Sequence, residues 1–406
     1  MRKSYVKFII LNQPTKNKGD FAAFKALINL IITKYPQASI ECLFTGKDYD
    51  PLFGKVKNVT CRSVNLFGLW RITKICLKFP ILFKLLKFFP TYKEYSNRIS
   101  NSDVAILAPG GLEIGAYQEW SVLWDLAMVN SLNVPFAIYS RSIGKFINKS
   151  DSDRLFIKYA IEYLQKSKFN GLREKKSQEF ASMLGIHHFP AIDVVYSYTP
   201  ENSLDVKLTE GREDNYVVFV PSKFSNWHPD FTDELQEKMD RLYKLIISKV
   251  IAGGFDVVML PHTYGRGNGN DDKDYFKTLI EDKYSANCII VDDTADTDDY
   301  QAIIKSAKFS VSARLHQIIF AINNHTPALC LSYEHKMSAM MEMLGLDDYS
   351  IDLKSVVLEH EKILPLLDEY INNASHHKDK FINAKNEAYK IAQDSFDNFI
   401  ESIEKN

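Results

Sequence analysis

Short apolar runs alternate along most of the chain with longer stretches in which apolar residues recur at helical spacing. The run at 5–11 precedes a helical stretch at 21–35, and the run at 307–313 precedes another at 315–322. A buried strand followed by an amphipathic helix is the repeating unit of parallel α/β sheets. The pattern therefore predicts an α/β protein in which strands and helices alternate.

A polar stretch without periodicity, 199–214, divides this pattern into two series. A chain of 406 residues is also too long for one ordinary core, so two domains are expected. We predict two doubly wound, Rossmann-like domains, 1–200 and 201–350, that face each other across a cleft. Residues 351–406 are expected to be helical, and packing back on the first domain is one arrangement for them.

A basic amphipathic segment at 66–98 interrupts the first series. Lysines at 74, 78, 84 and 87 are mixed there with Leu, Ile and Phe, and Pro80 predicts two short helices instead of one. No stretch of about 20 apolar residues is present that would span a membrane. Two interpretations stay open: a helical hairpin that covers part of the core, or peripheral contact of 71–95 with an anionic membrane surface.

Composition excludes several classes of protein. The 50 basic and 51 acidic side chains nearly cancel, which gives no general reason to expect a nucleic-acid partner. The five cysteines are scattered without a CxxC pair, and no cluster of carboxylates and histidines has ligand spacing, so neither disulfides nor a metal site are expected. A cytoplasmic location fits, with association at the inner face of the membrane as an option. The first apolar run is too short for a secretion signal.

Candidate ligand-binding residues follow several predicted strands, where open α/β sheets bind their ligands. Arg314 and His316 fall in the first turn of a predicted helix, whose free N–H groups favour an anion. Gly110 and Gly111 end another strand and allow a ligand to approach the backbone closely. Arg173 stands at a third strand-to-helix junction, where a surface salt bridge is the alternative.

The loop after the first strand contains Asn17, Gly19 and Asp20. Asp20 is placed to cap the following helix, which is sufficient to explain it. Alternatively, all three residues face the cleft. His262 follows Pro261 at a strand end, and a loop histidine without a role is the alternative there.

Seven motifs occur in one order along the chain: Asn17-Lys18-Gly19-Asp20, Pro109-Gly110-Gly111, Ser142-Ile143-Gly144, Arg173 with Ser177, Pro261-His262, Arg314-Leu315-His316, and Tyr333 with Lys336. The ordered set resembles the polysaccharide pyruvyl transferase family over roughly residues 5–350. The resemblance implies a fold like the GT-B glycosyltransferases and transfer of pyruvate from phosphoenolpyruvate to a sugar, usually as a ketal. This sequence departs from the family pattern at 140–145, which reads SRSIGK, whereas relatives often have a GQSIGP-like strand end.

The resemblance assigns donor binding to Arg173, Arg314 and Leu315, and Lys336 is a further candidate for neutralising phosphate. Phosphoenolpyruvate carries a phosphate and a carboxylate, and an arginine fork suits each. His316 is the expected proton-transfer residue, because histidine ordinarily titrates near neutral pH. Either Asp20 or His262 is the candidate base toward the acceptor hydroxyl. The expected acceptor-binding residues are Asn17, Gly19, Gly110, Gly111 and Arg141.

The expected substrates are phosphoenolpyruvate and a sugar or lipid-linked oligosaccharide of a surface polysaccharide, without cofactor or metal; the oligomeric state is left open. Two other functions fit the same architecture: a glycosyltransferase with a nucleotide-sugar donor, and a non-catalytic glycan-binding protein. The first needs a ribose-binding acid, and no convincing Asp/Glu pair follows the motif at 314–316. The second has no need for Arg173, Arg314 and His316 together.

Overall fold

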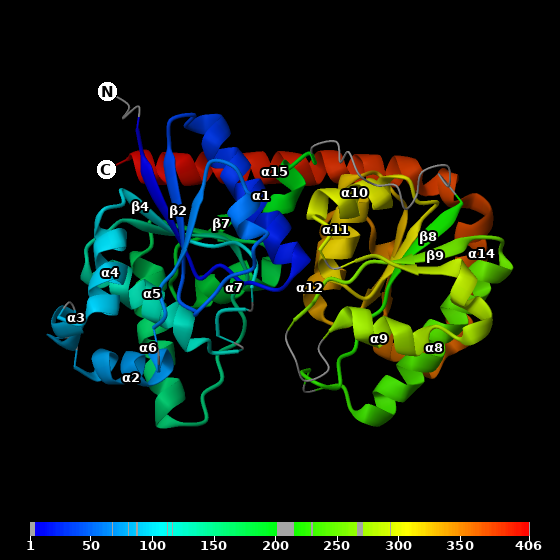
Figure 1. The fold of residues 1–406 in the computed structure, drawn as a ribbon, viewed down its shortest axis with the longest axis horizontal. Coiled ribbons are helices and arrows are strands. Elements are labelled where there is room, and N and C mark those ends of the chain that lie inside the picture. Colours follow the sequence, from blue (N-terminus) through cyan, green and yellow to red (C-terminus); the bar gives the residue numbers. More distant parts are fainter. Residues whose placement is uncertain are drawn as a thin grey trace. The chain divides into compact units, whose positions relative to one another are not determined.

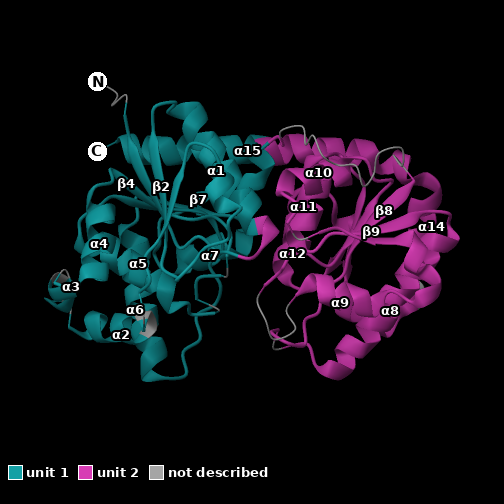
Figure 2. Ribbon diagram, in the orientation of Figure 1, with its two compact units in different colours: residues 1–15, 20–198, 390–406 teal, residues 16–19, 199–389 magenta. Residues whose placement is uncertain are grey.

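The structure is a computed structural model that describes residues 5–405 except 67, 80, 87, 112, 116, 201–214, 229, 266–270 and 293. It consists of two compact units (Figure 2). Unit 1 contains Met1–Thr15, Asp20–Tyr198 and Lys390–Asn406, and unit 2 contains Lys16–Gly19 and Thr199–Tyr389. Most of the linker expected at 199–214 lies outside the described residues.

Unit 1 is built on a seven-stranded sheet whose described pairings are all parallel (Figure 1). In sheet order the strands are β3 (Thr60–Ser63), β2 (Ser39–Phe44), β1 (Lys7–Leu11), β4 (Val104–Leu107), β5 (Phe136–Arg141), β6 (Phe169–Leu172) and β7 (Phe189–Pro190). The helices of this unit are α1 (Lys18–Lys34), α2 (Leu69–Lys78), α3 (Ile81–Leu86), α4 (Pro90–Ser100), α5 (Trp120–Ser131), α6 (Asp151–Lys166) and α7 (Lys175–Met183). The first two residues of α1 are grouped with unit 2.

Unit 2 has a six-stranded sheet, again with parallel pairings throughout. Its order is β10 (Cys288–Ile290), β9 (Asp256–Met259), β8 (Tyr216–Val220), β11 (Ser310–Ser312), β12 (Ala328–Ser332) and β13 (Ser350–Asp352). The helices of unit 2 are α8 (Asp233–Ala252), α9 (Asp272–Leu279), α10 (Thr297–Lys305), α11 (Leu315–Asn323), α12 (His335–Met343), α13 (Leu353–Leu358), α14 (Leu364–Asn373) and the first part of α15 (Lys378–Glu404).

These two sheets confirm the predicted fold class of two doubly wound, parallel α/β domains. Central strands such as β4 and β8 are buried along their whole length, as expected where helices cover both faces of a parallel sheet. In the basic segment the structure has two short helices on either side of residue 80, α2 and α3, as the sequence indicated, and α4 follows from Pro90.

One local sequence pattern is misleading. The Val-Val-Tyr run after Asp193 reads as a strand, but Val194–Ser197 is a 3₁₀ helix. The Asp193 side chain accepts a hydrogen bond from the backbone N–H of Val195 and so stabilises a turn instead of an extended strand. The C-terminal region is mainly helical and begins with the short strand β13, which pairs with β12.

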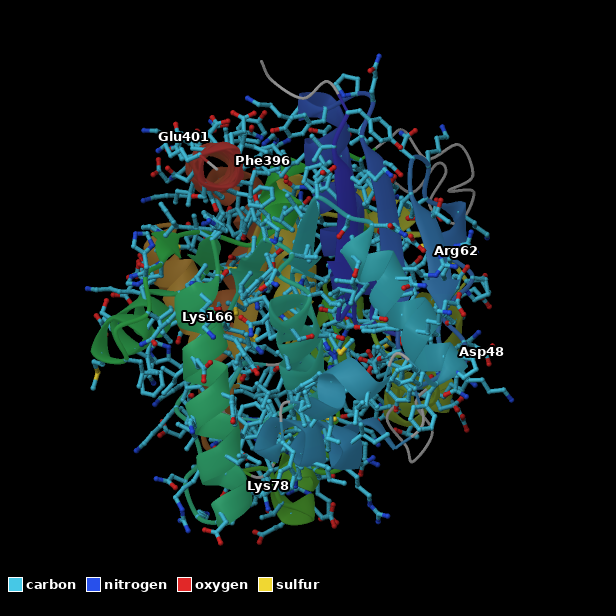
Figure 3. The ribbon with its side chains drawn as sticks, turned by 90° about the vertical axis from the view of Figure 1, so that its left-hand side faces the viewer. Asp48, Arg62, Lys78, Lys166, Phe396 and Glu401 are labelled. Carbon is cyan, nitrogen blue, oxygen red and sulfur yellow. The ribbon has the colours of Figure 1, made fainter. Side chains whose placement is uncertain are left out.

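The end of α15 belongs to the core of unit 1. Phe396, labelled in Figure 3, and Phe399 pack edge-on against Tyr139 of β5, with ring centroids 6.2 and 5.4 Å apart. Such edge-to-face pairs are a preferred aromatic geometry. The last helix is therefore part of the first unit's packing as well as of the second's.

Each sheet has a switch point, where the connections from two neighbouring strands leave in opposite directions. In unit 1 this point lies between β1 and β4, and in unit 2 between β8 and β11. Loops diverge beyond the carboxyl ends of such strands and leave room for a ligand. The fold therefore selects the loops after these four strands as the places to look for a site.

Candidate functional site

Five residues of unit 1 meet beyond β1, β4 and β5. We call them the glycine-loop cluster: Asn12, Asp20, Gly110, Gly111 and Arg141. Asp20 Oδ1 accepts a hydrogen bond from the Gly111 N–H at 2.9 Å. Arg141 Nε donates to the Gly110 carbonyl oxygen at 2.9 Å, and Nη1 donates to Asn12 Oδ1 at 3.1 Å. Four predicted site residues are thus brought together with Asn12, which sequence reasoning missed.

Both glycines of this cluster are required by its geometry. Their φ angles, 81° at Gly110 and 74° at Gly111, lie in the left-handed region. A Cβ atom on Gly110 would also lie 2.3 Å from Asp20 Oδ1, and one on Gly111 would lie 2.3 Å from Arg141 Nη2. The glycine pair therefore allows a carboxylate and a guanidinium to approach the loop backbone.

Arg141 is completely buried. Burial lowers its pKa to about 10, against the raising effect of Glu119 and Asp20, so the side chain keeps its charge at neutral pH. Its Nη2 atom has no hydrogen-bond acceptor among the described residues. The cluster thus holds a positive charge against the Gly110–Gly111 loop. This position is compatible with the acceptor-side role that the sequence suggested for Arg141.

A buried carboxyl group lies behind this arginine. Asp125 of α5 accepts a hydrogen bond from the Tyr95 hydroxyl and is completely buried. Burial raises the pKa of Asp125 to about 7, although hydrogen bonds from Tyr95 and Asn12 and the charge of Arg141 act in the opposite direction. Asp125 therefore titrates near neutral pH inside the unit.

Replacing this carboxyl group is expected to change how stability depends on pH. Because the folded-state pKa exceeds the unfolded value, the folded protein holds an extra proton between about pH 4 and 7, and stability falls as pH rises through that window. Asp125→Asn mimics the protonated form, so at pH 8 it should be more stable than wild type by up to about 4 kcal/mol. Urea unfolding at pH 5 and 8 measures the difference. Asp151→Asn, at an exposed position, is the control, and parallel pH profiles for wild type and Asp125→Asn would contradict the expectation.

Arg173 lies in the same unit within a network of carboxylates. Its Nη1 atom is 2.5 Å from Asp193 Oδ2, its Nη2 donates to Ser142 Oγ at 3.2 Å, and Glu174 Oε1 lies 3.8 Å from Nε. Burial would lower the pKa of Arg173, but Asp193 and Glu174 outweigh it and raise the pKa. The structure therefore supplies Arg173 with internal counter-charges, and its donor-binding role stays a prediction.

The second group of candidate residues lies in unit 2, beyond β11 and β9. We call it the arginine–histidine cluster: His262, Asp272, Arg314 and His316. Arg314 precedes α11 as its N-cap, and its Nη2 donates to Asp272 Oδ1. The other oxygen of Asp272 accepts from the N–H groups of His262 and Thr263, at 2.9 and 2.8 Å. One buried carboxylate thus fixes both Arg314 and the loop at 262–263.

The ion pair with Asp272 does not use every hydrogen-bond donor of the Arg314 guanidinium. Its side chain is 16 % exposed, and its Nε atom has no acceptor within the described part of the chain. The residue stands at the start of a helix that follows a strand end, where helix N–H groups favour an anion. This placement suits a ligand phosphate or carboxylate.

His262, a predicted base, is buried, and its Nε2 atom is 3.1 Å from Gln317 Oε1. Burial lowers its pKa to about 3, and the charges of Arg314, His316 and Lys18 act in the same direction, whereas the bond to Gln317 opposes them. A neutral imidazole with so low a pKa is a weak base. Its contacts favour an orienting role over proton abstraction.

The segment Lys16–Gly19 packs into this cluster. The Lys18 N–H donates to the His262 carbonyl oxygen, and Asn17 forms an isolated antiparallel bridge with Thr263. The Lys18 ammonium is completely buried, donates to the Ala295 carbonyl oxygen at 2.7 Å and lies 4.6 Å from the ring centre of Tyr264. Lys18 therefore anchors the predicted motif to unit 2.

Gly19 lies against the imidazole of His316. A Cβ atom on Gly19 would fall 2.0 Å from both Cγ and Nδ1 of that ring. Asn17 and Gly19 were predicted to bind the acceptor, and the structure places them in unit 2 beside His316 and Thr263. Their acceptor-binding role stays a prediction.

The two remaining donor-side candidates are also in unit 2. Leu315 is the first residue of α11 and is partly exposed. Lys336, in the first turn of α12, pairs with Glu334 at 2.7 Å. Burial would raise the pKa of Glu334, but Lys336 and Tyr333 lower it overall, so the pair is charged at neutral pH.

The structure thus divides the predicted site residues between the two units. Unit 1 holds Asp20, Gly110, Gly111, Arg141 and Arg173, and unit 2 holds Asn17, Gly19, His262, Arg314, Leu315, His316 and Lys336. Sequence reasoning missed Asp272, because nothing local marks an aspartate as the partner of an arginine far along the chain. In the described part of the chain, no group of three His, Cys, Asp or Glu side chains is arranged to hold a metal ion.

The architecture is that of GT-B proteins, as solved structures show. UDP-GlcNAc 2-epimerase from Neisseria meningitidis, bound to UDP-GlcNAc, has a TM-score of 0.60 at 10 % identity and covers 99 % of this chain and 100 % of its own. The putative UDP-N-acetylglucosamine 2-epimerase from Listeria monocytogenes has a TM-score of 0.60 at 10 % identity, covering 96 % and 94 %. The trehalose 6-phosphate synthase from Burkholderia multivorans has a TM-score of 0.55 at 9 % identity, covering 99 % and 98 %. At these identities the likeness shows the fold alone.

The sequence defines the group more narrowly. The family model for polysaccharide pyruvyl transferase matches residues 17–335, which include both clusters apart from Asn12. This chain belongs to the polysaccharide pyruvyl transferase family. It is also similar to the amylovoran biosynthesis protein AmsJ of Erwinia amylovora, with 27 % identity over 128 residues. That match covers 30 % of this chain and 30 % of the relative's length.

Proposed function

We propose that this protein transfers pyruvate from phosphoenolpyruvate to a sugar of a surface-polysaccharide repeat unit and forms a ketal across two hydroxyls. The observation that carries the proposal is the family match over 17–335 together with the position of Arg314-Leu315-His316 at the start of α11. A helix start beyond a strand end provides backbone N–H groups for an anionic donor. The name of the similar AmsJ protein, which places it in amylovoran biosynthesis, supports a polysaccharide as the acceptor.

The reaction has a defined balance of atoms and protons. The methylene carbon of phosphoenolpyruvate gains a proton, the adjacent carbon becomes oxocarbenium-like, and one sugar hydroxyl oxygen bonds to it. The bond from that carbon to the phosphate oxygen breaks, phosphate leaves, and the second hydroxyl oxygen takes its place. Both hydroxyls lose their protons: one balances the proton gained by the methylene carbon and the other is taken up by the leaving phosphate, so the products are a pyruvate ketal and hydrogen phosphate.

The unit 2 residues suit the donor half of this reaction. Arg314 is oriented by Asp272 and its side chain is 16 % exposed, so the guanidinium can bind an anionic oxygen of the donor. His316, held against Gly19, is the proposed proton donor to the methylene carbon. Because His262 is buried and its pKa is low, we propose that it holds the loop beside Arg314 and does not transfer a proton.

The unit 1 residues suit the acceptor half. Asp20 is the proposed base toward a sugar hydroxyl, since its Oδ1 accepts a hydrogen bond from the Gly111 N–H, which fixes the carboxylate in the glycine-loop cluster. Arg173 is proposed as a further donor ligand on the strength of the family resemblance. We propose that neither a metal ion nor another cofactor takes part.

The test is phosphate release from phosphoenolpyruvate with a panel of nitrophenyl hexosides and lipid-linked oligosaccharides as acceptors. Sugar-dependent release, with a product heavier than the acceptor by one pyruvate less water, is the expected result. Consumption of a nucleotide-sugar without phosphate release from phosphoenolpyruvate would instead identify a glycosyltransferase. No turnover of either donor, with phosphoenolpyruvate failing to raise the melting temperature at millimolar concentration, would favour a glycan-binding protein.

A further inference from the structure

Exposed large apolar side chains are concentrated in one segment of unit 1. Six of the thirteen such side chains in the described part of the chain lie between residues 75 and 89, with exposed fractions from 47 % to 74 %. They are Ile75, Phe79, Ile81, Leu85, Phe88 and Phe89. Isolated exposed apolar residues are ordinary on soluble proteins, whereas a contiguous group marks an interaction surface. We call this group, together with Arg71, Lys74 and Lys78, the apolar–basic face.

The charged residues along this part of the sequence have a single sign. No aspartate or glutamate occurs between Asp50 and Glu94. The basic residues of the same stretch are Lys55, Lys57, Arg62, Arg71, Lys74, Lys78, Lys84, Lys87 and Lys93. The whole chain has almost equal numbers of acidic and basic side chains, so this is a local concentration of positive charge.

The outward orientation of the face is fixed by the packing of the opposite side of the same helices. Cys76 and Leu77 of α2 and Phe83 of α3 are buried in the hydrophobic core of unit 1. The ring of Phe83 packs 5.9 Å from that of Trp124. Because these residues hold the helices in place, one side of the segment covers the core, and the other side presents apolar and basic residues to the surroundings.

The face lies at the same end of the sheet as the glycine-loop cluster. Helix α2 begins soon after the carboxyl end of β3, and the Lys74 ammonium lies 4.5 Å from the ring centre of Trp120, the first residue of α5. Helix α5 itself follows the Gly110–Gly111 loop. Figure 3 shows Lys78 at the end of unit 1 opposite to Phe396 and Glu401 of α15.

We propose that the apolar–basic face docks unit 1 on an anionic lipid bilayer. Its exposed Phe, Ile and Leu side chains enter the headgroup region, and the lysines and arginines above them bind the lipid phosphates, as in other interfacial amphipathic helices. A second copy of the chain would bring the same positive charge to a two-fold interface, which like-charge repulsion opposes. A bilayer supplies both an apolar layer and uniform negative charge. Among the described helices, none is long and apolar enough to cross the bilayer, so the contact is peripheral.

Docking in this way brings the loops beyond β1, β4 and β5 to the membrane surface, because they lie at the same end of unit 1 as α2. A lipid-linked sugar would then meet the glycine-loop cluster at the bilayer. This last consequence rests on the proposed function, whereas docking itself does not.

Sedimentation of the full chain with vesicles tests the proposal. Binding to phosphatidylcholine vesicles that contain phosphatidylglycerol should be at least about tenfold stronger than to phosphatidylcholine alone, and should fall at least about tenfold from 0.1 to 1 M salt as charges are screened. Phe79→Ser/Phe88→Ser should weaken binding by at least about tenfold, since it removes two large apolar side chains. Arg71→Glu/Lys78→Glu should do the same through charge.

Two matched variants control for the chemistry of these changes. Met183→Ser/Leu358→Ser removes exposed apolar side chains elsewhere, and Lys380→Glu/Lys390→Glu reverses exposed charges on α15; both should bind vesicles like wild type. All variants should keep the native melting temperature. Equal binding to neutral and anionic vesicles, retention of binding by Phe79→Ser/Phe88→Ser, or conversion of a dimer to a monomer without any vesicle binding would overturn the proposal. Turnover of a soluble sugar by Phe79→Ser/Phe88→Ser should match wild type, which separates this test from that of the proposed function.

Discussion

Arg314→Ala is expected to lower kcat/KM for sugar-dependent phosphate release by about 10²–10³-fold, the usual effect of removing one charge-stabilising donor from an active site. The guanidinium stands at the start of α11, is oriented by Asp272 and has an unused donor among the described residues. Arg314→Lys keeps the charge but loses the fork, so it should recover only part of the activity. Steady-state kinetics on a soluble acceptor measure all three proteins.

The same substitution leaves Asp272 buried without its cation, and breaking a buried pair costs about 3–5 kcal/mol. A loss of activity could then reflect unfolding. Arg314→Ala/Asp272→Asn removes the leftover charge and should recover stability while activity stays low. Arg241→Ala, at an exposed arginine of α8 in the same unit, is the matched control with native activity. Wild-type kinetics for a folded Arg314→Ala would exclude Arg314 from donor binding.

Gly19→Ala should reduce kcat by about 10²-fold, because a small displacement of a catalytic group has effects of that size. The added methyl group would overlap the His316 ring, whose Cγ and Nδ1 atoms lie 2.0 Å from its position, so the imidazole has to move. Overpacking of this kind typically destabilises by about 1–3 kcal/mol, so most of the protein should stay folded. Kinetics together with a melting curve separate the two effects.

A double-mutant cycle shows whether Gly19 acts through His316. In a His316→Ala background the overlap with the ring is gone and only the contact with the Cβ atom of residue 316, at 2.6 Å, remains, so Gly19→Ala should cause much less further loss of activity. Gly46→Ala is the matched control, since a Cβ there meets nothing closer than 3.5 Å. If Gly19→Ala and His316→Ala lower activity independently, Gly19 has another role than making room for the imidazole.

The bounds of some helices can be recognised from local sequence patterns alone. The ranges Asp151–Lys166 and Asp233–Ala252 are examples, and both are amphipathic helices with a capping residue, Ser150 or Thr232, directly before them. Periodicity and caps are local signals, so they can be read without knowing what the helix packs against. The Val-Val-Tyr run after Asp193 shows the limit, because one side-chain hydrogen bond to the backbone outweighed the strand propensity of three residues.

The site was foreseen less completely than the fold. Gly110, Gly111 and Arg314 could be found because strand ends and helix starts are recognisable in the sequence. The residues that pair with them could not be found in this way. Asn12 and Arg141 are 129 positions apart, and Arg314 and Asp272 are 42 positions apart.

By itself, the sequence determined the alternation of strands and helices, the order of the family motifs, and the presence of the site residues at the carboxyl ends of strands. The tertiary structure alone decided which carboxylate neutralises each arginine, Asp193 for Arg173 and Asp272 for Arg314. It also decided that Gly19 adjoins His316. The physical reason is that strand and helix patterns depend on neighbours within a few residues, whereas an ion pair or a close approach depends on which loops the sheet order brings together.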